Sequence, residues 1–156
     1  MNHSNAELLQ RLFTSLDRHD HREMATCYHA DATFTDIAFD LRGRKLIHAM
    51  WHMICETDIR ASFHVLEVDD RVGRVNLVDD YTFTSTGRAV HNVIDSHFRL
   101  RDGLIIEHQD LCDARVWAAM ALGGVSGFLA GRLRFLRSYR AQQMLQAFMA
   151  KHSEYR

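Results

Sequence analysis

The sequence of 156 residues lacks proline, internal repeats and low-complexity segments, and it also lacks an excess of charge of either sign. With 19 basic and 20 acidic residues its formal net charge is -1. This balance gives no bulk attraction to nucleic acid or to an anionic membrane surface. We therefore expect no nucleic-acid and no membrane partner, and a small, neutral or weakly polar ligand fits the composition better.

Cysteine and long apolar runs are scarce as well. The chain has three cysteines, Cys27, Cys55 and Cys112, and its first ten residues have neither a basic start nor an apolar signal core. An odd number of cysteines without a signal segment is typical of a reducing compartment, so we expect a cytoplasmic protein. The longest uncharged run, residues 116–131, contains Gly and Ser and is shorter than the ~20 residues of a spanning helix.

Three helices are predicted in the first third of the chain. Ser4 and Glu7 have the spacing of a capping box, and apolar residues then recur at helical spacing over residues 5–18. The segment "REMATCYH" predicts a short second helix with Met24, Cys27 and Tyr28 on its buried side, and helical periodicity returns after the strand-like "ATFTDIAF" with Trp51 among the apolar positions.

Strand chemistry dominates the middle of the chain. β-branched and aromatic residues gather in residues 62–68, 74–84, 89–101 and 104–111, and the intervening "DDRVG", "STGR" and "RDG" are turn sequences. The pattern predicts an antiparallel meander, then a helical tail over residues 114–151 that is interrupted near Gly123 and Gly124. We expect one α+β domain spanning residues 1–156, a cone-shaped curved antiparallel sheet wrapped around the N-terminal helices with an extra C-terminal helix. Such a cone encloses either a packed core or a small-molecule cavity.

Carboxylates interrupt the apolar faces of three predicted strands. Asp110 shares a face with Ile106, His108 and Cys112, Asp79 alternates with Leu77, and Asp36 is in register with Phe34. A buried carboxylate costs several kcal/mol unless it is paired or hydrogen-bonded. These residues therefore either mark bulges, edges and Arg pairs, or they converge on a cavity where their pKa values are driven apart for acid-base chemistry.

Two segments resemble the nuclear transport factor 2-like superfamily, which includes ketosteroid isomerases, SnoaL-like polyketide cyclases and limonene-epoxide hydrolases. They are "DRHDHREMATCYHADATFTD" and "FRLRDGLIIEHQDLCD", and the resemblance spans about residues 6–113. It implies the cone fold, a hydrophobic pocket, homodimerisation and no cofactor. Many activities are carried by this fold, so the resemblance identifies the fold more sharply than the reaction.

The resemblance also implies roles for individual residues. Asp36 lies where ketosteroid isomerases have their general base, Asp110 lies where the hydrolases and cyclases have a catalytic base, and Asp79 lies where the hydrolases have a general acid. Other family positions differ here, with Leu12 for an oxyanion tyrosine, Leu77 for an arginine and Phe34 for a water-positioning tyrosine. Either Asp95 or Ser96 corresponds to the isomerases' second oxyanion donor.

These observations favour an enzyme that performs cofactor-free isomerisation, cyclisation or water addition on a small hydrophobic molecule. Its predicted catalytic residues are Asp110, Asp79, Asp36 and His108, and its predicted lining residues are Tyr28, Phe34, Trp51, Leu77, Asn92 and Ile94. The alternative is a non-catalytic module of the same superfamily that binds a ligand or a protein partner.

Four further features have two interpretations each. His48 and His52 have the i, i+4 spacing of zinc ligands, but without HExxH or CxxC we expect surface histidines and no metal. Gly123, Gly127 and Gly131 suit either close helix packing or a flexible loop. An arginine band is interpreted as the solvated face of a tail helix, which could also cover the mouth of the cone; it comprises Arg132, Arg134, Arg137 and Arg140. Cys112 fits a buried, inert thiol better than a nucleophile.

Overall fold

The structure is a computed structural model, and it describes residues 3–156. Three helices, α1 (His3–Asp17), α2 (His21–Thr26) and α3 (Arg44–Cys55), come before or between the first strands. Leu9, Leu12 and Phe13 are fully buried on α1, as its apolar spacing predicts. The helix begins earlier than predicted, so Ser4 lies inside it and not at its N-cap.

Six strands form one sheet in the order β2-β1-β6-β5-β4-β3. The strands are β1 (Tyr28–Thr35), β2 (Asp40–Arg42), β3 (Arg60–Val68), β4 (Val72–Phe83), β5 (Arg88–Arg101) and β6 (Leu104–Leu111). The predicted meander is confirmed, since β3, β4, β5 and β6 pair antiparallel in sequence order. β1 joins it through a parallel pairing with β6, and the short β2 was not predicted.

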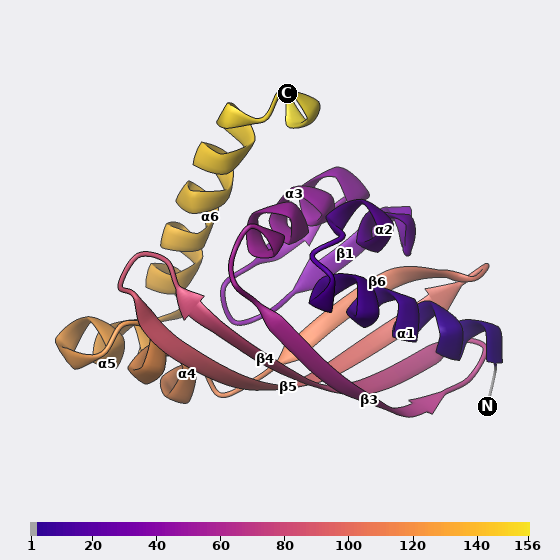
Figure 1. Cartoon of the computed structure of the whole chain (residues 1–156), viewed down its shortest axis with the longest axis horizontal. Coiled ribbons are helices and arrows are strands. Elements are labelled where there is room, and N and C mark those ends of the chain that lie inside the picture. The colour runs from indigo at the N-terminus through magenta and orange to yellow at the C-terminus, as the bar shows by residue number, and fades with distance from the viewer. Residues whose placement is uncertain (1–2) are drawn as a thin grey trace.

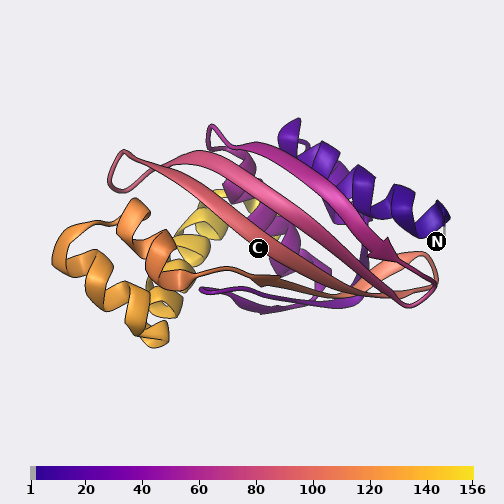
Figure 2. The same cartoon turned by 90° about the horizontal axis from the view of Figure 1, so that it is seen from below.

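The helices and the sheet form an α+β fold in which one face of the sheet is covered. The helices α1, α2 and α3 lie over one side of the curved strands (Figure 1), and they contribute most of the apolar core with the inner strand residues. Seen from the other side, the central strands have no helix in front of them (Figure 2). The inner face is therefore where a buried site can form.

Two details of strand register differ from the prediction. Tyr28 begins β1 and does not close α2, because the helix ends at Thr26 and the backbone N–H of Ile105 donates to the carbonyl of Cys27, which joins the chain to β6. On β6 a bulge opposite Arg99 and Leu100 makes Ile105 the fully buried residue, where strict alternation predicted Ile106.

The tail forms three helices, α4 (Ala114–Ala121), α5 (Gly124–Arg132) and α6 (Arg134–Lys151), and ends in a short 3₁₀ turn, η1 (Ser153–Tyr155). The predicted break at Gly123 is confirmed, and a second break falls at Leu133. α4 and α5 lie at one end of the strands, and α6 runs from there back toward α3 (Figure 1). No helix in residues 3–156 combines the length and apolarity needed to cross a membrane.

Part of the arginine band docks the tail onto the sheet. Arg134 donates to the carbonyl of Asp36 at 2.9 Å, and Arg137 donates to the carbonyl of Ile37 at 2.8 Å. Both acceptors belong to the turn between β1 and β2. These two arginines therefore hold the tail against the sheet and are not simply a solvated face.

The glycines of α5 allow a close approach to α4. A Cβ added at Gly127 would lie 2.7 Å from the carbonyl oxygen of Ala118, and one at Gly131 would lie 3.0 Å from the Cα of Arg115. Because these neighbours are backbone atoms, they have little freedom to move aside. The two glycines thus have the packing role rather than the loop role.

We expect Gly127→Ala to destabilise the protein by about 1–2 kcal/mol, since overpacking against backbone outweighs the gain in helix propensity. Chemical denaturation measures the change. Ser126→Ala, at an exposed position of the same helix, is the matched control and should leave stability nearly unchanged. Equal stabilities for both variants would contradict the close packing of α4 and α5.

Candidate active site

A chain of buried hydrogen bonds crosses the interior of the cone. The indole Nε1 of Trp51 donates to the hydroxyl oxygen of Tyr28 at 3.0 Å, and that hydroxyl contacts Nδ1 of His108 at 2.8 Å. Nε2 of His108 lies 2.7 Å from Oδ1 of Asp110, which also accepts from the hydroxyl of Ser96 at 2.5 Å. The chain thus links α3, β1, β6 and β5 and ends on one carboxylate.

Donor chemistry gives this chain a direction. The indole N–H can only donate, so the Tyr28 oxygen accepts from it and the Tyr28 O–H is left to donate to Nδ1 of His108. The proton of the neutral imidazole then lies on Nε2 and points at Asp110. Burial raises the pKa of Tyr28 well above its ordinary value, which keeps the phenol protonated as a donor. Every donor is used, and Asp110 accepts as a carboxylate.

Aromatic rings fix the imidazole of His108, which is completely buried. Phe34 meets it edge-on at 4.9 Å between centroids, Phe13 does so at 6.2 Å, and Phe98 lies at 4.3 Å. The ring therefore has little freedom to rotate. The sequence predicted that His108 sets the orientation of Asp110, because the two share a strand face. The ring contacts of His108 are compatible with that role.

Asp110 itself is 7% exposed. Within residues 3–156, both of its hydrogen bonds are made to Oδ1. The second oxygen, Oδ2, is consequently the one that could take a proton from a substrate. A carboxylate held in this way is oriented before any ligand binds, which is what a general base requires.

Asp79 is the second buried carboxylate of the inner face, on β4 opposite Asn92 of β5. In the part of the chain that the structure describes, its buried Oδ1 has no hydrogen-bond partner. Burial raises the pKa of Asp79 well above its ordinary value, and the charges of Asp110 and Asp80 raise it further. Both effects favour the protonated form of Asp79, which could therefore donate a proton.

Asp36 has a different environment from the one predicted. It follows the end of β1 and its Oδ1 accepts from the backbone N–H groups of Ala38 and Phe39, so it closes the turn before β2. Burial raises its pKa to about 6, and the charge of Asp110 adds to this while the two N–H groups oppose it. The expectation of a strand residue in register with Phe34 is wrong, but Asp36 remains within electrostatic reach of Asp110.

The tail covers the sheet next to Asp79. Tyr81 lies two residues beyond Asp79 on the same strand, and its hydroxyl accepts from the indole of Trp117 in α4 at 2.7 Å. Burial raises the pKa of Tyr81 to about 12 and that of the Cys112 thiol to about 11, so both groups keep their protons at neutral pH. The assignment of Cys112 as an inert thiol is consistent with this.

The predicted lining residues occupy the inner face. Leu77 and Ile94 are buried and directly opposite each other, and Phe34 packs its ring edge-on against Trp51 at 5.7 Å. Asn92 is half-buried and donates weakly to Cys112 Sγ at 3.7 Å. Tyr28 and Trp51 are more than lining, since their polar atoms belong to the hydrogen-bond chain.

The sequence reasoning did not assign two residues of this site, Ser96 and Tyr81. Ser96 faces inward onto Asp110, whereas Asp95 points outward to Arg74 with two hydrogen bonds of 2.8 Å, which decides between these neighbours. The sequence reasoning did not assign Tyr81, although it alternates with Leu77 and Asp79 along one face of its strand. That alternation, with the turn after it, was the signal that could have placed it in the site.

Two hollows occur on the described surface, and neither is lined by Asp79 or Asp110. One, of about 310 Å³, lies between α3 and the C-terminal end and includes His48 and Tyr155. The other lies beside α4 and includes Arg88 and Met120.

A family model described as a SnoaL-like domain matches residues 9–108, almost two-thirds of the chain. The chain belongs to the SnoaL-like domain family. No curated protein matches it closely enough in sequence to count as a relative. Family membership confirms the resemblance inferred from the sequence and assigns the nuclear transport factor 2-like fold.

Solved structures agree on the fold. A candidate polyketide cyclase from Silicibacter sp. TM1040 is 15% identical, with a TM-score of 0.69 over 76% of this chain and 95% of that one. An epoxide hydrolase from M. tuberculosis, described as LEH-like, is 12% identical, with a TM-score of 0.61 over 92% of this chain and 96% of that one. A ketosteroid isomerase-like protein from Catenulispora acidiphila in complex with trimethylamine is 15% identical, with a TM-score of 0.65 over 74% and 92%.

We expect Asp79→Asn to remove a pH dependence of stability. A carboxyl pKa that is raised in the folded state contributes stability below about pH 4, and this contribution is lost as the pH rises through the folded pKa. The midpoint of thermal unfolding of the variant should therefore rise relative to that of the wild type as the pH increases from about 4. Parallel curves for the two proteins would contradict the raised pKa. Asp102→Asn, at an exposed turn position, is the control.

We expect Tyr28→Phe to destabilise the protein by about 1–3 kcal/mol, because Nδ1 of His108 and the indole N–H of Trp51 each lose a buried partner. Urea unfolding measures the loss. Tyr139→Phe, at an exposed position of α6, is the control and should cost little. A Tyr28→Phe variant as stable as wild type would show that the chain is not formed.

Proposed function

We propose that this protein is an enzyme that performs cofactor-free acid-base chemistry on a small hydrophobic organic molecule. The observation that carries the proposal is the contrast between two buried carboxyl groups on one inner face. Asp110 accepts hydrogen bonds from Ser96 and His108, whereas Oδ1 of Asp79 has no partner within residues 3–156 and burial raises the pKa of that group. Carboxyl groups whose pKa values are driven apart are the usual arrangement for an acid and a base that act together.

In this proposal Asp110 is the general base. Its Oδ2 takes a proton from a carbon acid or from an attacking water, while His108 and Ser96 hold Oδ1 and stabilise the carboxylate. Asp79 gives its proton to the oxygen on which negative charge develops, and so would serve isomerisation, cyclisation or water addition alike. Asp36, with its raised pKa, is a second group able to exchange protons near the base.

The lining supports a hydrophobic substrate. Leu77, Ile94 and Phe34 surround the carboxyl groups with apolar surface, and Asn92 adds one amide that can bind a polar substituent. The neighbouring structures include a candidate polyketide cyclase and an epoxide hydrolase, and this supports the proposal of a hydrophobic organic substrate. Access to the inner face would require the contact between Trp117 and Tyr81 to open.

A turnover screen tests the proposal. Wild type, Asp110→Asn and Asp79→Asn are incubated with terpenoid epoxides, steroid enones and aromatic polyketide precursors, and products are followed by mass spectrometry. For any compound that is turned over, each variant should lower kcat by about 10²–10⁴-fold while far-ultraviolet circular dichroism is unchanged. Full activity of Asp110→Asn would refute the role of the base.

The second candidate function is ligand binding without catalysis. It is favoured by a computationally designed 17-OHP binder of this fold, which is 15% identical with a TM-score of 0.59. A compound that raises the melting temperature of the wild type without being converted would support binding alone. The Asp110→Asn variant should then bind a neutral ligand about as well as the wild type.

We propose that two copies pair through the uncovered face of the sheet. Large apolar side chains are exposed on four of the strands at Leu66, Val72, Val93 and Leu111, and Val93 is 55% exposed. No helix lies in front of these strands (Figure 2). Exposed apolar side chains on a sheet face that no helix covers support an interface between copies.

We expect Val93→Glu to shift a dimer toward monomer, because a buried charge at the centre of an apolar interface is strongly unfavourable. Sedimentation velocity at micromolar concentration measures the change. His64→Glu, on an exposed position of β3, would be the less disruptive comparison. A wild-type protein that is monomeric at this concentration would contradict the proposal.

A further inference from the structure

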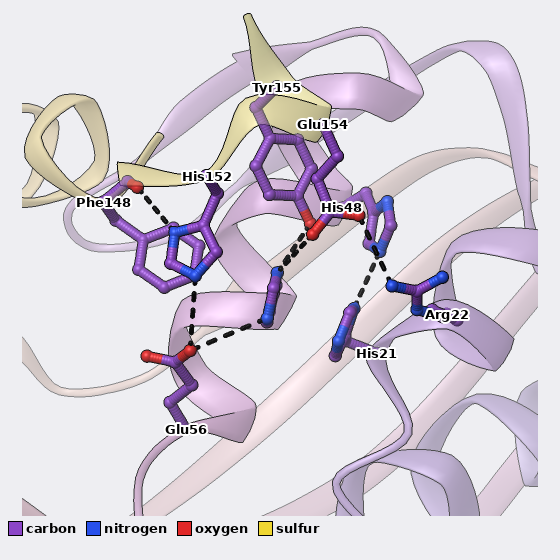
Figure 3. A network of polar contacts seen from close by, with 9 residues as sticks. His21, Arg22, His48, Glu56, Phe148, His152, Glu154 and Tyr155 are labelled. Carbon is purple, nitrogen blue, oxygen red and sulfur yellow. Dashed lines mark hydrogen bonds and ion pairs between the residues drawn. The ribbon is translucent and has the colours of Figure 1, made fainter. Parts of the chain in front are cut away.

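A second cluster of polar side chains lies outside the cone, where the end of the chain meets α3. It contains four histidines, two glutamates and a tyrosine, namely His21, His48, His52, His152, Glu56, Glu154 and Tyr155 (Figure 3). His21 and His52 stack with their ring centroids 3.6 Å apart. The proposed acid-base chemistry uses none of these residues.

Three of these side chains direct electron-pair donors at one point. Oε1 of Glu56 lies 3.7 Å from Nε2 of His52 and 3.5 Å from Nε2 of His152. All three atoms lie within 4.8 Å of one another. Two imidazole nitrogens and a carboxylate oxygen are a ligand set that zinc prefers.

The distances between the candidate ligand atoms agree with those around a bound zinc ion. Zinc bonds of 2.0–2.1 Å in a tetrahedron separate neighbouring ligand atoms by about 3.3–3.4 Å. Both distances to Glu56 are within a few tenths of an ångström of that value. A small rotation of the exposed Glu56 side chain would therefore bring its oxygen to the spacing that zinc ligands have. Glu56 is 56% exposed and His152 27%, which leaves a path for an ion and room for water.

The outer nitrogens of both histidines are already engaged. Nδ1 of His152 lies 2.8 Å from the carbonyl oxygen of Phe148, which can only accept, so the proton of the neutral ring lies on Nδ1. Nδ1 of His52 lies 2.9 Å from the Tyr155 hydroxyl and 3.4 Å from the Glu154 carboxylate, which favours a proton there too. Both Nε2 atoms are left with a lone pair facing Glu56, and metal-binding histidines are oriented by such outer contacts.

From this geometry we propose that His52, Glu56 and His152 form a binding site for a divalent transition-metal ion of the zinc class. His52 belongs to α3 and Glu56, at i, i+4 spacing, is the residue that caps its C-terminus. His152 caps the C-terminus of α6, 100 positions after His52 in the chain. The bound ion would fasten the end of the tail to α3, one residue from Trp51, and would keep one or more waters as remaining ligands. The proposal is independent of the proposed function.

Zinc titration of the untagged full chain tests the site. Calorimetry should give one ion per chain for the wild type, and zinc at 100 times its Kd should raise the melting temperature by about 5–10 °C. Co²⁺ in place of Zn²⁺ should give visible absorption bands that report nitrogen and oxygen ligands. Wild-type zinc binding no tighter than that of a double variant, Glu56→Gln with His152→Gln, would overturn the proposal.

Variants assign the ligands. Glu56→Gln and His152→Gln should each weaken zinc binding by at least ~10-fold, and loss of the outer contact in Tyr155→Phe should have a smaller effect. His64→Gln, which removes an exposed histidine from β3, should bind as the wild type does. Circular dichroism verifies that each variant is folded. Binding that survives in both Glu56→Gln and His152→Gln but is lost in His48→Gln would place the ion at His21 and His48 and refute the assignment.

Discussion

The hydrogen-bond chain from Trp51 through Tyr28 and His108 to Asp110 is the constraint on which the interior depends. It joins α3 to β1 and to β6, which are far apart in sequence, and its central imidazole is buried among aromatic rings. Buried polar groups of this kind stabilise a fold only when all of them are satisfied. Here each donor points toward Asp110. The chain therefore forms only when the register of β1 against β6 and the position of α3 are both correct.

The same chain determines the electrostatics of the inner face. An ionised Asp110 raises the pKa of Asp79, Asp36 and Tyr28, although burial is the larger cause for each. Asp79 has no compensating hydrogen bond to Oδ1 within residues 3–156, which is a cost to the folded state. Costs of this kind are expected where a group is retained for chemistry and not for stability. The tail adds to the site by covering it, through Trp117 and two arginines.

Local patterns were sufficient for the meander, the long helices and the inward positions of Asp79 and Asp110, because alternation and turn chemistry act over a few residues. They failed where a distant partner decides the outcome. Tyr28 became a strand residue because β6 pairs with it, Ile105 turned inward at a bulge, and Asp36 closes a turn. His52 and His152 meet only through the docking of α6, which no spacing in the sequence could reveal.

The most direct test of this account is the tautomer of His108, measured by nitrogen-15 NMR of the imidazole at neutral pH. The account predicts a neutral ring with its proton on Nε2 and an Nδ1 shift typical of a hydrogen-bond acceptor, because Tyr28 donates on one side and Asp110 accepts on the other. A proton on Nδ1 of a neutral ring would reverse the chain. Asp110 would then have to be protonated to satisfy Nε2, and its assignment as the base would be wrong.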